Sequence, residues 1–251
     1  MNRIPPIFIA FAVLASASLA VAQAPAAGTI SRVYFNTPKA GHTQAYEQGR
    51  KAHMAFHKSA GDRFAYQTYE VLNGEDTGDY IIVTGSHQWK DFDGRDDFDV
   101  ADAADVEKNV AAHVERSDNS FWTFRPEMSR GKETDAPTKY VAVTIFRVRP
   151  EAVPDFTAAV KQVNAGIVKT KYPSIPGRWY SLANGGDGPA FALLQPRNSF
   201  ADFQGPEKDL DAMMVEAHGE QGKAILGTLR KATIGTTSHI MAHRPDLSYV
   251  P

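Results

Sequence analysis

The feature that most constrains this fold is an internal repeat. Residues of similar type recur in the same order at a separation of 111 positions, and the separation widens by eight positions near the end of each copy. An ordered series of matches through most of a chain indicates two copies of one structural unit. The matched positions are Phe35 with Phe146, Tyr69 with Tyr180, 73–74 with 184–185, 89–94 with 200–205, and 124–129 with 243–248.

The repeat places a first unit near residues 29–130 and a second unit near residues 139–251. Between them, residues 131–138 are polar and rich in turn-forming types, which is typical of a linker. The chain is therefore predicted to hold two tandem units joined by a short connection.

Each unit is predicted to end its last strand with an Arg-Pro pair, at Arg125-Pro126 and at Arg244-Pro245. Proline stops further strand pairing because it has no backbone N–H to donate. A duplicated position serves the same packing need in both copies. We therefore expect both arginines to be structural, either at the ends of a barrel or paired with a nearby carboxylate.

Residues 1–22 are predicted to be a signal peptide. Arg3 gives a positive start, an apolar run follows, and Ala20 and Ala22 are the small residues that signal peptidase recognises. The run is short for a membrane-spanning helix. We expect a mature chain that begins at Gln23, is exported to the periplasm or the extracellular space, and is not held in a membrane.

Composition excludes several classes of function. The chain has 251 residues, with 27 basic and 29 acidic side chains, and this near balance argues against nucleic-acid binding. It has no cysteine, which excludes disulfides, thiolate zinc sites and iron–sulfur clusters. The sequence also lacks the Gly-x-Ser-x-Gly, Walker and dinucleotide-binding motifs. These absences argue against serine-hydrolase and nucleotide-dependent chemistry.

Each unit is predicted to have the order β-α-β-β-α-β, which is the split βαβ arrangement of ferredoxin-like folds. Aromatic and β-branched residues mark the strands, and Asn73-Gly74 with its repeat marks a hairpin turn. The predicted fold class is α+β. The expected strands are 29–36, 64–72, 79–86, 120–125, 139–149, 178–183, 190–195 and 236–243, and the expected helices are 42–60, 99–116, 153–171 and 206–231.

With this duplicated element order, the chain resembles the dimeric α+β barrel superfamily. That superfamily includes antibiotic-biosynthesis-type monooxygenases, haem-degrading monooxygenases and chlorite dismutase-like haem proteins. The resemblance implies two ferredoxin-like units packed sheet to sheet as a barrel within one chain, because a sheet with helices on one face leaves its other face to be covered. It also implies that a ligand cavity lies between a sheet and its own helices.

The first unit is expected to carry the ligand site because its histidines are missing from the second unit. His53 and His57 match Asn164 and Val168, and packing needs shared by both copies do not explain the difference. His53 is the leading polar residue, since a neutral imidazole can orient a ligand or accept a proton. The candidate ligand-binding residues are His53, His57, Tyr34, Tyr66 and Trp89.

The histidines lie four residues apart on helix 42–60, a spacing that can serve a metal. Two ligands without a positioned carboxylate make an incomplete site, and Glu47 projects elsewhere on the helix, so no metal is predicted. His53 is expected at the edge of the buried face and His57 further towards solvent. The expected apolar face is Ala45, Gly49, Ala52, Phe56 and Ala60.

The resemblance raises haem as an alternative cofactor. Residues 213–223, which include His218, are similar to the proximal-histidine helix of chlorite dismutase-like proteins, although they lie on the last helix. The topologically matching helix, 153–171, has no histidine. Asn36 and Trp89 are loosely similar to porphyrin-contacting residues of haem-degrading monooxygenases, but no histidine follows Trp89 at short spacing. The prediction is therefore no cofactor, with haem as the minor alternative.

The sequence leaves more than one function open. The leading hypothesis is an exported protein that binds a small hydrophobic or aromatic molecule, either without catalysis or with a cofactor-free, oxygenase-like activity. The alternatives are a non-catalytic structural module and a haem-binding protein. A homodimer is a further possibility that the sequence leaves open. A cavity lined by Tyr34, Tyr66, His53 and Trp89 favours the first hypothesis, whereas a fully packed interior favours the structural module.

Overall fold

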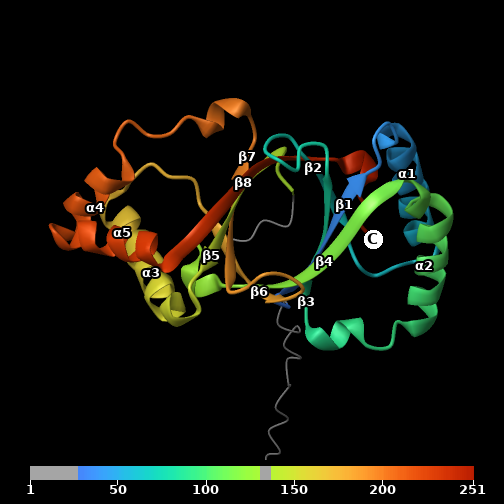
Figure 1. The fold of residues 1–251 in the computed structure, drawn as a ribbon, viewed down its shortest axis with the longest axis horizontal. Helices are drawn as coiled ribbons and strands as arrows, with labels where there is room; N and C mark the ends of the chain where they lie inside the picture. The colour runs from blue at the N-terminus through green and yellow to red at the C-terminus, as the bar shows by residue number, and fades with distance from the viewer. Residues whose placement is uncertain (1–27, 131–136) are drawn as a thin grey trace, which may run out of the picture.

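The computed structural model of the chain describes residues 28–130 and 137–251. The expected signal peptide and most of the expected linker lie outside the described residues. The first half contains the six elements predicted for one ferredoxin-like unit, in the predicted order (Figure 1). They are β1 (Ile30–Pro38), α1 (Thr43–Ser59), β2 (Gln67–Val71), β3 (Tyr80–His87), α2 (Asp96–Asn109) and β4 (Val114–Phe124).

The second half repeats this order with one additional helix. Residues expected as one helix over 206–231 form two helices, because Gly219 adopts a φ of 62° and breaks the helical path between them. Among the described residues, no helix is long and apolar enough to cross a membrane. The elements are β5 (Tyr140–Val148), α3 (Val153–Thr170), β6 (Arg178–Asn184), β7 (Ala190–Arg197), α4 (Leu210–His218), α5 (Gln221–Ala232) and β8 (Thr233–His243).

One predicted boundary in the first unit was wrong. The expected helix 99–116 begins earlier and ends at Asn109, and the residues from Val114 onward are strand. They form strand because Thr37, Asn36 and their neighbours on β1 pair with them in antiparallel register. The lengthened β4 carries Ser117 and Asn119, which reach the functional site described below.

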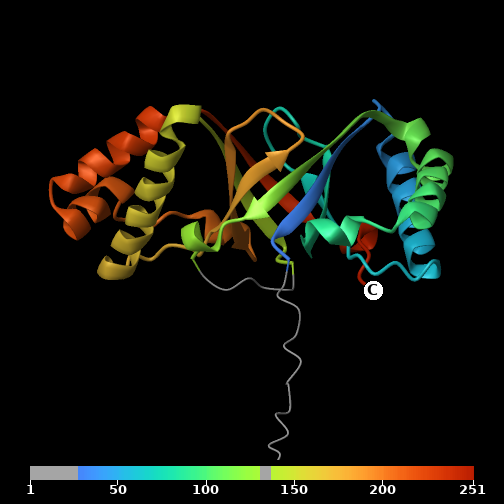
Figure 2. The same ribbon diagram turned by 90° about the horizontal axis from the view of Figure 1, so that it is seen from below.

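The two units form one closed antiparallel barrel with the strand order β1-β3-β2-β8-β5-β7-β6-β4. Each unit supplies a four-stranded sheet, and the sheets join edge to edge where β2 pairs with β8 and β4 pairs with β6. The helices lie outside the barrel on two opposite sides, α1 and α2 against the sheet of the first unit and α3, α4 and α5 against that of the second (Figures 1 and 2). This arrangement confirms the predicted α+β class and the tandem ferredoxin-like units.

The barrel is closed at both seams by short segments that cross from one unit into the other. After β4, the 3-10 turn Pro126–Met128 buries Met128 among the side chains of the second unit. After β8, the turn Pro245–Leu247 buries Leu247 among those of the first unit. Both side chains are 0% exposed. We call these two segments the exchanged turns.

The exchanged turns explain the most exact part of the sequence repeat. Ser129 Oγ accepts from the backbone N–H of Trp179 and donates to the carbonyl of Arg125. Ser248 Oγ makes the corresponding bonds with Thr68 N–H and the carbonyl of Arg244. The two copies are therefore most similar in sequence at the two seams, where equivalent hydrogen bonds are formed.

The two Arg-Pro arginines are structural, as predicted, but they are not equivalent. Arg244 donates to Glu47 on α1, to Glu70 on β2 at 2.9 Å and to Asp246 at 3.0 Å, so it ties the end of β8 to the first unit. It also holds the pKa values of Glu47 and Asp246 below their ordinary range, that of Asp246 at about 2. The Arg125 guanidinium pairs with its near neighbour Glu127 and, among the described residues of the second unit, makes only one long hydrogen bond, to Ser181 Oγ at 3.4 Å.

Removal of the Arg244 guanidinium is expected to destabilise the barrel. The change Arg244→Ala leaves Glu47 and Glu70 close together without their shared cation, and we expect it to lower the free energy of unfolding by about 1–3 kcal/mol. Urea denaturation followed by circular dichroism measures this loss. The matched variant Arg125→Ala breaks a local, exposed pair and should cost less than about 1 kcal/mol. Equal losses in the two variants would contradict the assigned role of Arg244.

Candidate functional site

A cavity of about 230 Å³ lies between α1, α2 and the sheet of the first unit. This is the location implied by the superfamily resemblance. Four of the five candidate ligand-binding residues line it, namely Tyr34 from β1, His53 and His57 from α1, and Tyr66 before β2. The other lining side chains are Asn36, Arg50, Ile82, Asp102, Val106, Val110, Ser117 and Asn119.

The fifth candidate, Trp89, does not line this cavity. Its side chain is 52% exposed and packs against Phe92 and Phe121 beyond the end of β3. His87 is also outside the cavity lining, with its ring 4.0 Å from that of Phe64. His87 is the last residue of β3, and Trp89 begins the 3-10 helix that follows it, so both lie beyond the part of β3 that lines the cavity.

The predicted buried face of α1 was wrong. Ala52 and Ala60 are not among the buried residues of the helix, whereas Tyr46, Arg50, His53 and His57 face inward. His57, expected nearer to solvent than His53, is the more buried of the two, at 1% against 3% exposed. The prediction assumed that only apolar side chains of the helix are buried. It was wrong because these polar side chains turn towards partners on α2 and on the loop after α1.

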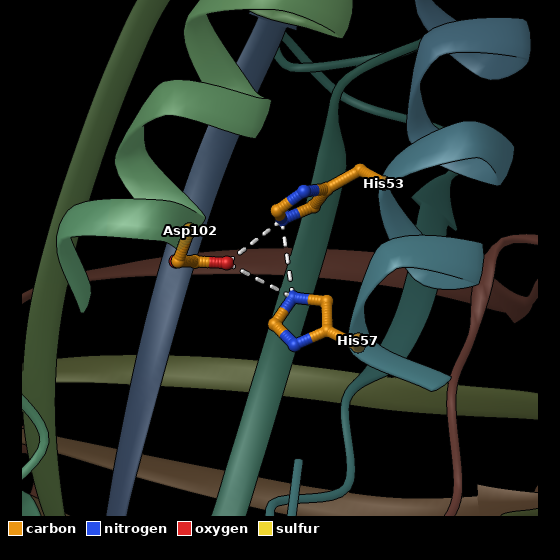
Figure 3. Close-up of side chains that lie close together, drawn as sticks. All are labelled: His53, His57 and Asp102. Carbon is orange, nitrogen blue, oxygen red and sulfur yellow. Dashed lines mark hydrogen bonds and ion pairs between the residues drawn. The ribbon is translucent and has the colours of Figure 1, made fainter. Parts of the chain in front are cut away.

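Each histidine is oriented by its own carboxylate. His53 Nδ1 lies 2.8 Å from Asp105 Oδ1, and His57 Nδ1 lies 2.8 Å from Asp62 Oδ2. A carboxylate accepts a hydrogen bond, so each Nδ1 carries the proton and donates it. Each Nε2 is then the nitrogen with the free lone pair. The two Nε2 atoms point towards one another at a separation of 3.1 Å (Figure 3).

Asp102 from α2 completes the group. Its Oδ1 lies 3.3 Å from His57 Nε2 and 3.5 Å from His53 Nε2, as Figure 3 shows. This oxygen is buried and accepts no hydrogen bond from the described residues. Burial, together with the charges of Asp62 and Asp99, raises the pKa of Asp102 to about 6. The expectation that no carboxylate is positioned beside the histidine pair was therefore wrong.

Both histidines are held in the neutral form. Burial lowers the pKa of His53 to about 4, and the nearby Arg50 guanidinium adds to this effect. Burial also lowers the pKa of His57, although Asp62 opposes the shift. Two neutral imidazoles with Nε2 lone pairs can accept a proton or coordinate a cation. Within the described ranges, His53, His57 and Asp102 form the group of histidines and carboxylates close enough to share one metal ion.

Arg50 places a buried guanidinium in the cavity, and two of its nitrogens lack hydrogen-bond partners among the described residues. Its side chain is 6% exposed, and the two nitrogens are Nε and Nη2. Burial lowers the pKa of this arginine, which shows how poorly the site solvates its charge. A buried cation without a partner is strongly unfavourable. The cavity is therefore suited to an anionic group beside Arg50.

Asp62 is supported from both units. Arg95 donates to its two oxygens at 2.9 and 3.3 Å, and the guanidinium also lies 4.0 Å from the centre of the Phe64 ring. Burial alone would raise the pKa of Asp62, but the hydrogen bonds from Arg95 and Phe64 N–H lower it overall. Tyr249, which follows the second exchanged turn, donates its hydroxyl to the Asp62 carbonyl at 2.8 Å. The barrel seam thus helps to hold His57.

The acidic residues of the site escaped the sequence analysis, although they left a signal. Asp99, Asp102 and Asp105 recur every three residues and so lie along one side of α2. Such a stripe is normally a solvated face. Only the packing of α2 beside α1 turns Asp102 and Asp105 towards the histidines, and Asp62 joins them from the loop after α1.

The second unit has no equivalent site at the matched position. Asn164 donates to the carbonyl of Met128 in the exchanged turn, and Val168 is exposed. The space between α3 and its sheet is filled by a cluster that includes Phe156, Trp179 and Phe191. The polar group is therefore a property of the first unit alone.

Haem does not fit the residues that the resemblance suggested. The filled space under α3 leaves no room for a porphyrin there. His218 Nε2 lies 3.2 Å from the carbonyl of Gln162, so this imidazole is engaged between helices. A second cavity, of about 220 Å³ inside the barrel, is lined mainly by apolar side chains such as Val33, Phe35 and Leu194.

Comparisons with known proteins agree on the fold. No protein-family model matches the chain, and no curated protein matches its sequence significantly. Among solved structures, an anthrone oxidase-like protein is similar with a TM-score of 0.56 and 12% identity, over 86% of this chain and 91% of that chain.

Two further structures extend the comparison. A putative monooxygenase from Lactobacillus acidophilus NCFM gives a TM-score of 0.53 and 11% identity, over 89% of this chain and 96% of that chain. Chlorite dismutase from Candidatus Nitrospira defluvii gives 0.51 and 10% identity, over 88% of this chain and 92% of that chain. At these identities the comparisons define the fold alone. The predicted fold, a barrel of two tandem ferredoxin-like units, is confirmed.

The assigned tautomers can be tested with Asp62→Asn. The oxygen of the substituted amide remains the acceptor for Phe64 N–H and Arg95, so its NH₂ group faces His57 Nδ1 and must donate to it. We expect His57 to change from the Nδ1–H to the Nε2–H tautomer, which long-range ¹H–¹⁵N correlation spectra of the imidazoles detect. His53, held by Asp105, should keep its Nδ1–H form as the internal control. An unchanged His57 spectrum argues against the assigned hydrogen bond.

Proposed function

We propose that this chain is an exported small-molecule-binding protein with oxygenase-like activity, whose ligand occupies the first-unit cavity. The expected ligand has a largely apolar or aromatic body and one acidic oxygen, such as a carboxylate or a phenolate. The single observation that carries the proposal is the buried, unpartnered guanidinium of Arg50 inside this cavity, as the described residues define it.

The lining fits both parts of such a ligand. The rings of Tyr34 and Tyr66 and the side chains of Ile82 and Val110 supply the apolar walls. A cavity of about 150 Å³ is sufficient for benzene. The volume of about 230 Å³ therefore leaves room for one ring with a small substituent. Arg50 would form a charged hydrogen bond with the acidic oxygen. This bond would offset the desolvation cost of burying the guanidinium.

The oxygenase part of the proposal draws on fold and chemistry together. Proteins described as putative monooxygenase and anthrone oxidase-like share this barrel, although the fold hosts many chemistries. In this chain, the neutral imidazoles of His53 and His57 lie in the same cavity as Arg50. Their Nε2 lone pairs lie beside the space for the ligand and can orient it.

The cavity favours this function over the structural-module alternative, for which a packed interior was expected. The first unit keeps a cavity with polar and apolar lining where the second unit has a packed core. The chain also closes its own barrel, so barrel formation requires no second copy.

The role of Arg50 is tested with benzoate and its neutral analogue benzyl alcohol as probes. We expect the purified protein to bind benzoate more tightly than benzyl alcohol, and Arg50→Met to weaken benzoate binding at least tenfold, because a charged hydrogen bond is lost (about 1.5–3 kcal/mol). Isothermal titration calorimetry measures both affinities.

The repeat supplies a matched control for this experiment. Lys161 occupies the equivalent position on α3 and is exposed, so Lys161→Met should leave benzoate binding unchanged. Circular dichroism verifies that both variants are folded. The proposal fails if the wild-type protein does not distinguish benzoate from benzyl alcohol, or if Arg50→Met and Lys161→Met bind benzoate equally well.

Export is a separate part of the proposal and is tested separately. Expression of the full chain in a Gram-negative host is expected to yield a periplasmic product that begins at Gln23, because the small residues before this point suit signal peptidase. Intact-mass measurement of the periplasmic fraction identifies the cut. Retention of residues 1–22, or confinement of the product to the cytoplasm, would contradict the signal-peptide prediction.

A further inference from the structure

We infer that His53 Nε2, His57 Nε2 and Asp102 Oδ1 form a binding site for one divalent first-row transition-metal ion, with iron(II) as the favoured ion. The relevance of this ion to oxygenase chemistry rests on the proposed function. The site itself rests on the geometry of the three side chains (Figure 3).

The first observation is that three atoms with lone pairs face one another. Asp62 and Asp105 fix the Nδ1–H tautomers, so the Nε2 atoms 3.1 Å apart both present lone pairs. The buried Asp102 Oδ1, 3.3 and 3.5 Å away, adds a third electron donor. Three converging donors without a hydrogen atom between them repel one another, and a cation among them converts that repulsion into attraction.

A shared proton is the rival to a metal ion at this point. A proton can join only two of the three atoms in one hydrogen bond, whereas a metal ion can bind all three at once.

The three distances fit coordination geometry. Metal–nitrogen and metal–oxygen bonds in such sites are about 2.0–2.2 Å long. For the separations of 3.1, 3.3 and 3.5 Å, one point lies about 2.1 Å from all three atoms and about 0.9 Å out of their plane. The donors therefore occupy one face of a coordination polyhedron and leave the remaining positions open.

The surroundings match those of metal-binding histidines. A metal-ligating imidazole usually donates its other ring N–H to a carboxylate, which fixes the ring and makes the ligating nitrogen more basic. His53 has Asp105 in this role and His57 has Asp62. These partners are held in turn, Asp105 by Asn109 and Asp62 by Arg95.

Local charge also favours a divalent ion. The carboxylates of Asp62, Asp99, Asp102 and Asp105 outnumber the guanidinium groups of Arg50 and Arg95 by two around the imidazoles. A divalent cation balances this excess of negative charge.

The donor set identifies the class of metal. Imidazole and carboxylate ligands suit iron, zinc, cobalt and manganese, whereas ions that require thiolates have no ligands in a chain without cysteine. Two histidines and one carboxylate with open positions are the ligand pattern of non-haem iron(II) oxygenases. This inference replaces the expectation of a cofactor-free protein.

The test is metal binding in the absence of any organic ligand. The purified protein is stripped with EDTA and titrated anaerobically with iron(II), cobalt(II), manganese(II) and zinc(II). We expect one tightly bound ion per chain by elemental analysis after gel filtration, and a cobalt(II) absorption spectrum typical of mixed nitrogen and oxygen ligands. His53→Ala and Asp102→Asn should each weaken binding at least tenfold, as should the supporting variant Asp105→Asn.

Control variants separate this site from incidental histidine binding. His42 and His113 also form a close histidine pair, with Nδ1 atoms 3.2 Å apart at the surface, but they belong to no such group among the described residues. His113→Ala should bind metal as the wild type does. Asp102→Asn preserves side-chain size, so it remains informative if His53→Ala does not fold. The inference is overturned if the wild type binds no stoichiometric metal, or if Asp102→Asn and His113→Ala bind it equally well.

Failure of the metal site and failure of the proposed function are distinguishable. Arg50→Met removes a positive charge and no ligand atom, so it should bind metal at least as tightly as the wild type. Metal binding without discrimination of benzoate from benzyl alcohol would refute the proposed ligand and leave the metal site standing. Benzoate recognition by Arg50 without metal binding would refute the metal site alone.

Discussion

Closure of the barrel by the exchanged turns is the constraint on which the rest of the structure depends. Each sheet has two edges with unpaired backbone groups, and such edges are unfavourable unless they are covered or paired. Here β2 pairs with β8 and β4 with β6, and the chain beyond each last strand buries Met128 or Leu247 in the opposite unit. Neither unit completes its own core, so the two units must fold as one body.

The same closure builds the functional site. The chain beyond the second exchanged turn brings Tyr249 against the ring of His57 and onto the carbonyl of Asp62. Arg244, at the start of that turn, reaches Glu47 on α1, the helix that carries both histidines. The site of the first unit is thus held in place by residues of the second. A change at the seam is therefore transmitted to the cavity through α1.

Duplication explains what the units share, and charge explains where they differ. Ser129 and Ser248 make equivalent bonds because both seams have the same geometry. At the helix faces, the second unit filled the space with Phe156 and its neighbours. The first unit instead buries Arg50, two histidines and their carboxylates. Burial of so many polar groups is unfavourable for stability, which is why we attribute the cluster to function.

The sequence by itself determined the duplication, the order of the elements and the α+β class. These follow from local patterns and from matches that survive in both copies. The cavity under helix 42–60 was expected from the superfamily resemblance, together with the histidines found only in the first unit. Tertiary structure alone decided that α1 turns its polar face inward, that Trp89 lies outside the cavity and that Asp102 meets the histidine pair. The physical reason is that hydrophobic periodicity describes a helix against an apolar core. His53 and His57 are buried by hydrogen bonds to residues on other segments, and no pattern within one helix encodes those partners.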